Sequence, residues 1–186
     1  GRVLKVLIIP FLLLTLSSLI LLSLQYLGQY LGEYSLDNIL LKAVTTQQDL
    51  IREAQYGGNT FNIGKFEPTF AGILSKAPIA LNMAFFRPYL WDARNAVMLF
   101  SGLENLFMLG FSLYILIRVK FSTLFISLFS NPLLLFSFLF ALFFAFSVGL
   151  TTANYGALAR LKIPCIPFYT CSLFILYHLN LKKVLK

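Results

Sequence analysis

The chain has 186 residues, of which 59% are hydrophobic and 12% are charged, and 20 of them are phenylalanine. This composition is far more apolar than that of an ordinary soluble domain. The net charge of +8 does not indicate a nucleic-acid partner, because no basic stripe with interleaved aromatic residues lies outside the apolar runs.

The first apolar run, about residues 4 to 27, predicts a transmembrane helix within a first segment of residues 1 to 30. Arg2 and Lys5 lie at its start, which favours the cytoplasm for this end. The run is too long for a signal peptide and lacks a small-residue cleavage site. Because the run follows Gly1 almost at once, we expect the chain to be the C-terminal part of a longer membrane protein.

Residues 31 to 95 hold six of the seven acidic residues, and we expect them to form a loop on the outer face. Ser35 is placed to cap an amphipathic helix that ends at Gly57–Gly58 and packs on the membrane surface or on a neighbour. One face of this helix would hold Leu36, Ile39, Leu40, Ala43, Leu50 and Ile51. The apolar run at residues 71 to 86 is short and broken by Pro78, which predicts an interfacial or re-entrant helix.

Residues 96 to 186 are predicted to hold three further spans, at about 96–117, 132–149 and 164–179. The middle one has no charged side chain and is long enough to cross the roughly 30 Å hydrocarbon core as a helix. Residues 151 to 164 would form an outer hairpin. Basic residues at the cytoplasmic ends of the spans would be Arg118, Lys120, Lys182, Lys183 and Lys186.

These runs predict an all-α integral membrane protein with about four transmembrane helices and an amphipathic helix on the outer face. Both termini are expected in the cytoplasm. The lipid bilayer is therefore the first expected partner.

Glu104 is the one acidic residue after Asp92, and it lies inside the second predicted span. A carboxylate within the membrane is costly and by default suggests a functional site. We interpret it as a candidate catalytic residue. An equal alternative is a structural hydrogen bond to a neighbouring helix.

On the expected outer face, apolar runs are flanked by the basic residues Arg87, Arg160 and Lys162. This is unusual, because lysine and arginine beside membrane spans are more frequent on the cytoplasmic side. Guanidinium groups at an interface suit bidentate binding of phosphate or pyrophosphate. The alternative is a salt bridge to Glu104 or Asp92, or contact with lipid headgroups.

No metal site or cofactor is predicted. Cys165 and Cys171 are six residues apart, about 600° of helix rotation, so they would point in different directions. The sequence also lacks Walker A, zinc-protease and hydrolase nucleophile motifs.

Two stretches resemble a known group of proteins. Residues 76–107, KAPIALNMAFFRPYLWDARNAVMLFSGLENLF, are similar to the pattern P-x-x-x-N-x-x-x-F-R-P-[FY]-x-W-[ED] with a later glutamate in an apolar run. Residues 146–169, FSVGLTTANYGALARLKIPCIPFY, resemble N-[FY]-G-x-L-x-R-x-[KR] followed by P-x-x-P-[FY]. Both patterns are typical of poorly characterised polytopic membrane proteins from bacterial polysaccharide-biosynthesis clusters, loosely similar to O-antigen polymerases and ligases. Asp92 stands where that group more often has glutamate.

The resemblance implies a protein of the bacterial inner membrane that acts in cell-surface polysaccharide assembly, with a glycosyltransferase- or polymerase-like role. It would bind a lipid-linked pyrophosphate oligosaccharide at the outer leaflet. The matching signature residues are Arg87, Pro88, Trp91, Asp92, Glu104, Asn154, Gly156, Arg160 and Pro167. Substrate binding would fall to Arg87, Asp92, Asn154, Arg160 and Lys162, with Glu104 as a base or as a residue that orients an arginine.

A different class of function remains open. The chain would then be a non-catalytic membrane subunit of a larger transport or secretion complex, with other membrane subunits as partners, and Glu104 and Arg160 would join helices. A transporter or channel fits less well, because the spans have little polar lining beyond Glu104.

Overall fold

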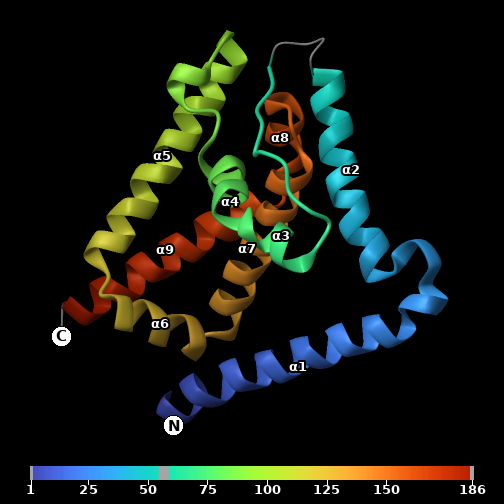
Figure 1. The fold of residues 1–186 in the computed structure, drawn as a ribbon. Coiled ribbons are helices and arrows are strands. Elements are labelled where there is room, and N and C mark those ends of the chain that lie inside the picture. The colour runs from blue at the N-terminus through green and yellow to red at the C-terminus, as the bar shows by residue number, and fades with distance from the viewer. Residues whose placement is uncertain (1, 55–58, 185–186) are drawn as a thin grey trace.

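The structure, a computed structural model, describes residues 2–54 and 59–184 (Figure 1). In chain order its elements are α1 (Arg2–Leu31), η1 (Gly32–Tyr34), α2 (Leu36–Ala54), α3 (Phe70–Ser75), α4 (Ala77–Phe86), η2 (Leu90–Asp92), α5 (Ala96–Arg118), α6 (Phe121–Ser130), α7 (Pro132–Thr151), α8 (Tyr155–Leu161) and α9 (Cys165–Val184). Within the described residues, the one non-helical pairing is a β-bridge between Thr60 and Asn154. The predicted all-α class is therefore confirmed.

In the described part of the chain, three helices are long and apolar enough to cross a membrane, and a bent pair of helices forms a fourth candidate. The three are Pro10–Gly28 of α1, all of α5 and all of α7, and the bent pair is α8 with α9, at 63°. Asparagine side chains fix where three helices begin. The side chain of Asn95 caps α5, that of Asn131 caps α7, and that of Asn154 caps α8.

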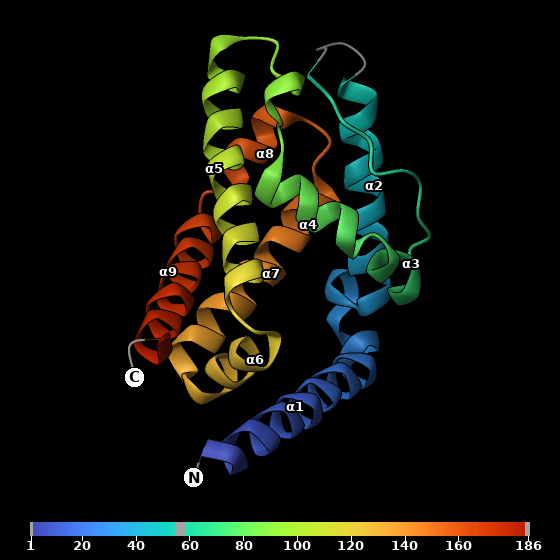
Figure 2. The same ribbon diagram turned by 90° about the vertical axis from the view of Figure 1, so that its left-hand side faces the viewer.

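The α1 helix is apolar on all sides, and none of its candidate span is buried inside the protein. It runs across one end of the other helices, beside α6 (Figures 1 and 2). A helix without a polar face needs an apolar environment around its whole circumference. In the structure α1 lies across the other candidate spans and not alongside them (Figures 1 and 2).

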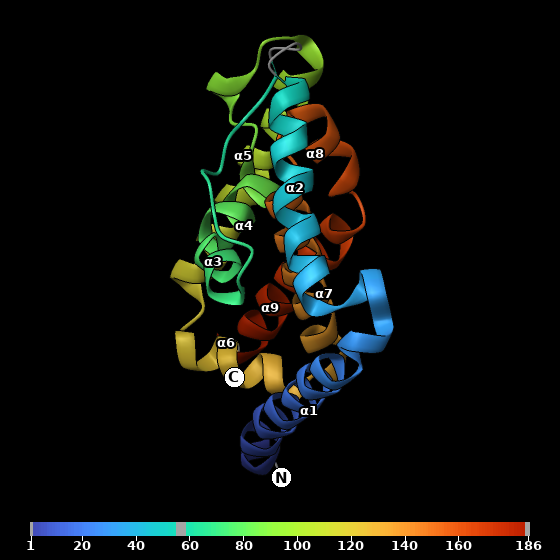
Figure 3. The same cartoon turned by 45° about the vertical axis from the view of Figure 1, so that its right-hand side comes forward.

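The predicted amphipathic helix is present as α2, and it packs along α7 (Figure 3). The Ser35 hydroxyl accepts a 3.4 Å hydrogen bond from the Asn38 amide, as the predicted cap requires. Val44 and Gln47 form the most buried part of this helix, whereas Ile39, which we expected on the packed face, is 44% exposed. The Leu36 side chain and the expected stop at Gly57–Gly58 lie outside the described residues.

The apolar run at residues 71–86 forms the short helix α3 and the helix α4, which packs against α7 and α5. Ala80 and Ala84 of α4 are fully buried. Gly149 of α7 allows this close approach, because a Cβ atom there would overlap the Ala80 carbonyl oxygen and lie 2.7 Å from its carbon. The structure therefore places α4 inside the helical assembly.

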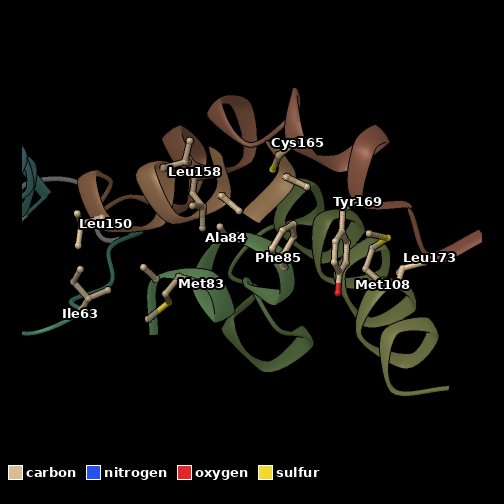
Figure 4. Close-up of a cluster of buried hydrophobic side chains, with 14 of the residues drawn as sticks. Ile63, Met83, Ala84, Phe85, Met108, Leu150, Leu158, Cys165, Tyr169 and Leu173 are labelled. Carbon is tan, nitrogen blue, oxygen red and sulfur yellow. The ribbon is translucent and has the colours of Figure 1, made fainter. Parts of the chain in front are cut away.

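The core between α4, α5 and α9 centres on two aromatic rings, those of Phe85 and Tyr169 (Figure 4). The rings stack with their centroids 4.1 Å apart. The Tyr169 hydroxyl is 2.8 Å from the Ser112 hydroxyl of α5, so the buried polar tip of the ring has a partner.

The segment at residues 151–164, which we expected to form an outer hairpin, contains the helix α8. The side-chain oxygen of Asn154 accepts hydrogen bonds from the amides of Gly156 and Ala157, at 2.7 and 3.3 Å. This side-chain cap fixes where α8 begins. The chain then bends at Lys162 into α9.

Candidate functional site

The charged residues of the two sequence motifs meet where α4 ends. Arg87 follows α4 and donates two hydrogen bonds to Asp92, from Nε to Oδ2 at 3.0 Å and from Nη2 to Oδ1 at 2.9 Å. Asp92 Oδ2 also accepts a 2.9 Å bond from the Tyr89 amide. The two side chains are 23% and 14% exposed. Of the alternatives open for Arg87, the salt bridge to Asp92 is the one that the structure contains.

Aromatic rings from both motifs enclose the Arg87 guanidinium. Its Cζ lies 5.2 Å from the centroid of Tyr89 and 5.8 Å from that of Tyr155, the first residue of α8. Such cation–π contacts hold a guanidinium in a partly dry environment. Tyr89 in turn donates a 3.0 Å hydrogen bond to Asn82. The two motifs are thus parts of a single cluster.

Lys162 lies behind this cluster, at the bend between α8 and α9, and only 6% of it is exposed. Its ammonium donates to Asn105 Oδ1 at 2.7 Å and to the Arg87 carbonyl at 3.2 Å. Asn105 completes the connection by donating from Nδ2 to the Pro88 carbonyl at 3.1 Å. A buried cation is tolerated only with such partners. These bonds join α5, the bend before α9 and the loop after α4.

Glu104 is exposed on α5, beside the inward-facing Asn105. Its carboxylate interacts electrostatically with Lys162. In the described part of the chain Glu104 forms no ion pair with Arg160 or Arg87. The helix-joining ion pair between Glu104 and Arg160 is therefore not present there.

The remaining predicted substrate residues lie differently. Arg160 is exposed, and its Nε donates to the Gly156 carbonyl of its own helix at 3.1 Å. Asn154 caps α8 and pairs with Thr60, next to Tyr155 of the cluster. Of the predicted site residues, the structure therefore brings together Arg87, Asp92 and Lys162, with Asn154 adjacent, and leaves Arg160 outside.

Three further residues belong to the cluster although the sequence reasoning did not single them out. They are Asn105, Tyr155 and Arg94. The Tyr155 hydroxyl interacts electrostatically with Arg87, Asp92 and Arg94. The sequence could have identified Asn105 as a site residue, because a polar residue inside an apolar run needs a buried partner. Tyr155 and Arg94 lie within the two quoted motifs.

Among the described residues, the cluster combines the cations Arg87 and Lys162 with the carboxylate of Asp92, and Arg94 and Glu104 lie near them. Among the residues that the structure describes, no group of three or more histidine, cysteine, aspartate or glutamate side chains is placed to hold a metal ion.

Comparison with known proteins gives no further assignment. No family model, curated protein or solved structure matches this chain. The resemblance of the two motifs therefore stays a prediction.

Proposed function

We propose that this chain is a multi-pass protein of the bacterial inner membrane that acts in cell-surface polysaccharide assembly. Its charged cluster would bind the pyrophosphate of a lipid-linked oligosaccharide at the outer leaflet. The observation that carries the proposal is the convergence of the two motifs. Arg87 and Asp92 of the first lie against Tyr155 of the second, and Lys162 bonds the Arg87 carbonyl.

The proposal has a specific physical basis in the unused hydrogen-bonding capacity of the cluster. Among the described residues, the one partner of Arg87 Nη1 is the Met83 sulfur, at 3.6 Å, and a thioether is a weak acceptor. A phosphate oxygen is a far stronger acceptor, and bonds from guanidinium to phosphate are charge-assisted.

In this proposal Glu104 is a positioning residue. It acts through Lys162, whose ammonium it attracts, and Lys162 holds the loop that carries Arg87. We therefore propose binding of the lipid-linked substrate, and assign no bond-breaking step to Glu104.

Binding of a defined lipid tests the proposal. The full chain in lipid nanodiscs would be titrated with a polyprenyl-pyrophosphate oligosaccharide and, in parallel, with the matching polyprenol. Arg87→Lys keeps the positive charge but removes the guanidinium, and it should weaken binding of the pyrophosphate lipid about 10- to 100-fold, since a charge-assisted hydrogen bond contributes about 1.5–3 kcal/mol. Arg118→Lys, at the opposite end of α5, is the matched control and should bind like the wild type. Equal affinity for the polyprenol, or an unchanged Arg87→Lys variant, would overturn the proposal.

The second candidate is a non-catalytic membrane subunit, and one observation favours it. Arg87, Asp92 and Lys162 bond to one another and to the backbone, as residues that join membrane helices do. Replacing a buried ion pair by apolar residues of similar volume is often neutral for stability. The double variant Arg87→Met, Asp92→Leu should therefore retain polysaccharide synthesis in cells if the pair is structural, and should lose it if the pair binds substrate.

A further inference from the structure

Two residues of opposite charge, Glu104 on α5 and Arg160 on α8, are exposed on candidate membrane spans. Among the described residues, neither forms an ion pair. Glu104 attracts the buried Lys162 without a hydrogen bond, and Arg160 donates to the Gly156 carbonyl of its own helix. A charged side chain on a membrane span is costly unless it meets an opposite charge or another polar partner. Each of the two residues therefore needs a partner from outside the chain.

Glu104 and Arg160 flank the same cavity. The cavity has a volume of about 150 Å³ and lies between the first turns of α5 and α8, with Ser101 and Gly156 in its lining. Glu104 follows Ser101 by three residues, and Arg160 follows Gly156 by four residues. Residues at these spacings are neighbours on one face of a helix. The carboxylate and the guanidinium therefore belong to the same side of the protein.

The two charges also lie at similar depth. Asn95 and Asn154, the caps of α5 and α8, both line the cavity, so the two helices begin on the same side of the membrane. At about 1.5 Å per residue, Glu104 lies roughly 12 Å along α5 and Arg160 at most about 8 Å along α8. This difference is less than one helical turn, and the long arginine side chain can span it.

A second copy of the chain offers both partners at the required depth. A two-fold axis along the membrane normal keeps every residue at its own depth and turns this side of one copy onto the same side of the other. Glu104 of each copy can then meet Arg160 of the other, so that one contact forms two identical ion pairs. A carboxylate and a guanidinium form strong, charge-assisted hydrogen bonds.

We propose that the chain forms a two-fold symmetric dimer in the membrane, in which Glu104 of each copy pairs with Arg160 of the other. The ion pair that is not present within one chain is then formed between two. This inference goes beyond the proposed function and rests only on the part of it that places α5 and α8 in the membrane. It does not depend on pyrophosphate binding.

Two single charge reversals test the dimer in a way that a role within one chain cannot imitate. Glu104→Arg places two bases in each contact of its own dimer, and Arg160→Glu places two acids there. Each variant alone should dimerise about 10- to 100-fold more weakly than the wild type, the effect of one or two lost charge-assisted hydrogen bonds. An equimolar mixture of the two should dimerise again, because every contact then joins an acid to a base.

Energy transfer between donor- and acceptor-labelled copies in liposomes, diluted stepwise with lipid, measures the dimerisation. The matched control is Lys120→Glu, a charge reversal at an exposed base beyond the opposite end of α5, which should dimerise like the wild type. A mixture that dimerises no better than each variant alone would overturn the dimer. So would a wild type that stays monomeric at every dilution, which would show that the two charges meet another protein.

Two neutral variants keep the test decisive if a charge reversal disturbs folding. Glu104→Gln and Arg160→Gln add no repulsion, and each should weaken dimerisation about tenfold. Wild-type dimerisation in both would contradict the proposed pairs. A dimeric wild type that binds the pyrophosphate lipid no better than the polyprenol would count against the proposed function alone. A wild type that binds the pyrophosphate lipid but never dimerises would overturn this inference alone.

Discussion

Lys162 and Asn105 lie 57 residues apart in the sequence, and their side chains form a 2.7 Å hydrogen bond from Nζ to Oδ1 in the protein interior. The same ammonium reaches the Arg87 carbonyl, and the same asparagine reaches the Pro88 carbonyl. The pair therefore connects the loop of the first motif to the bend that follows α8. Its energetic role can be measured directly.

The first prediction concerns this pair. Lys162→Met should destabilise the protein by about 1–3 kcal/mol, because Asn105 Oδ1 and the Arg87 carbonyl would each lose a donor inside the protein. Asn105→Leu should have a similar effect. Their double-mutant cycle, measured by denaturant unfolding in detergent, should give a coupling energy of about 0.5–3 kcal/mol. Additive effects of the two substitutions would show that the bond does not hold the cluster together.

The second prediction compares two ion pairs of different burial. Asp92→Asn should destabilise the protein by about 2 kcal/mol, because it leaves the enclosed Arg87 guanidinium without its carboxylate. The control is Glu33→Gln in the pair Glu33–Lys42, whose side chains are 80% and 60% exposed. The hydrogen bond from Lys42 lowers the pKa of Glu33, yet water screens so exposed a pair. No measurable loss is expected from the control, and equal effects of the two substitutions would contradict the difference in burial.

A third prediction tests the contact between α4 and α7. Gly149→Ala should destabilise the protein by about 3 kcal/mol, because its Cβ would overlap the backbone of Ala80 and force the two helices apart. Gly110→Ala is the matched control, since no atom lies within 4 Å of the added Cβ there. It should be neutral or stabilise by up to about 1 kcal/mol through helix propensity. Thermal unfolding followed by circular dichroism measures both, and a tolerated Gly149→Ala would show that α4 does not dock on α7 as described.

A fourth prediction concerns the sides of the membrane. The 23 residues of α5 extend about 34 Å, enough to cross a bilayer, so its two ends should face opposite sides. Asn95 lines the same cavity as Asn154, which places the start of α8 on the Asn95 side.

Labelling of single cysteines in intact cells tests this arrangement. Asn95→Cys and Arg160→Cys should react with a membrane-impermeant maleimide from one side, and Lys120→Cys only from the other. A Cys171→Ser background removes the exposed native thiol, while Cys165 is buried. Labelling of positions 95 and 120 from the same side would show that α5 does not span.

Much of the fold could be predicted because it depends on local signals. Uncharged apolar runs indicate helices wherever they are long enough, and asparagine or serine caps mark where such helices begin. Thus α5, α7 and the capped α2 were predicted close to their observed bounds. The helix α8 was missed because Asn154 and Gly156 are typical of turns as well as of helix starts.

The candidate site was harder to predict because its contacts join distant segments. Two carboxylates, Asp92 and Glu104, were both available to Arg87 from the sequence alone. The structure selects Asp92, which the short helix η2 places within reach of the guanidinium. It leaves Glu104 on the surface of α5, where the nearby cation is Lys162.

By itself, the sequence determined a helical, strongly apolar chain and the two motifs in which its chemistry would lie. The tertiary structure decided which side chains of those motifs meet. Arg160 and Lys162 are two residues apart, about 200° of helix rotation, so only one of them can face the interior. Lys162 is the buried one, because Asn105 and the Arg87 carbonyl supply the partners that a buried cation requires. That choice depends on how α5 packs against α9, which no local pattern records.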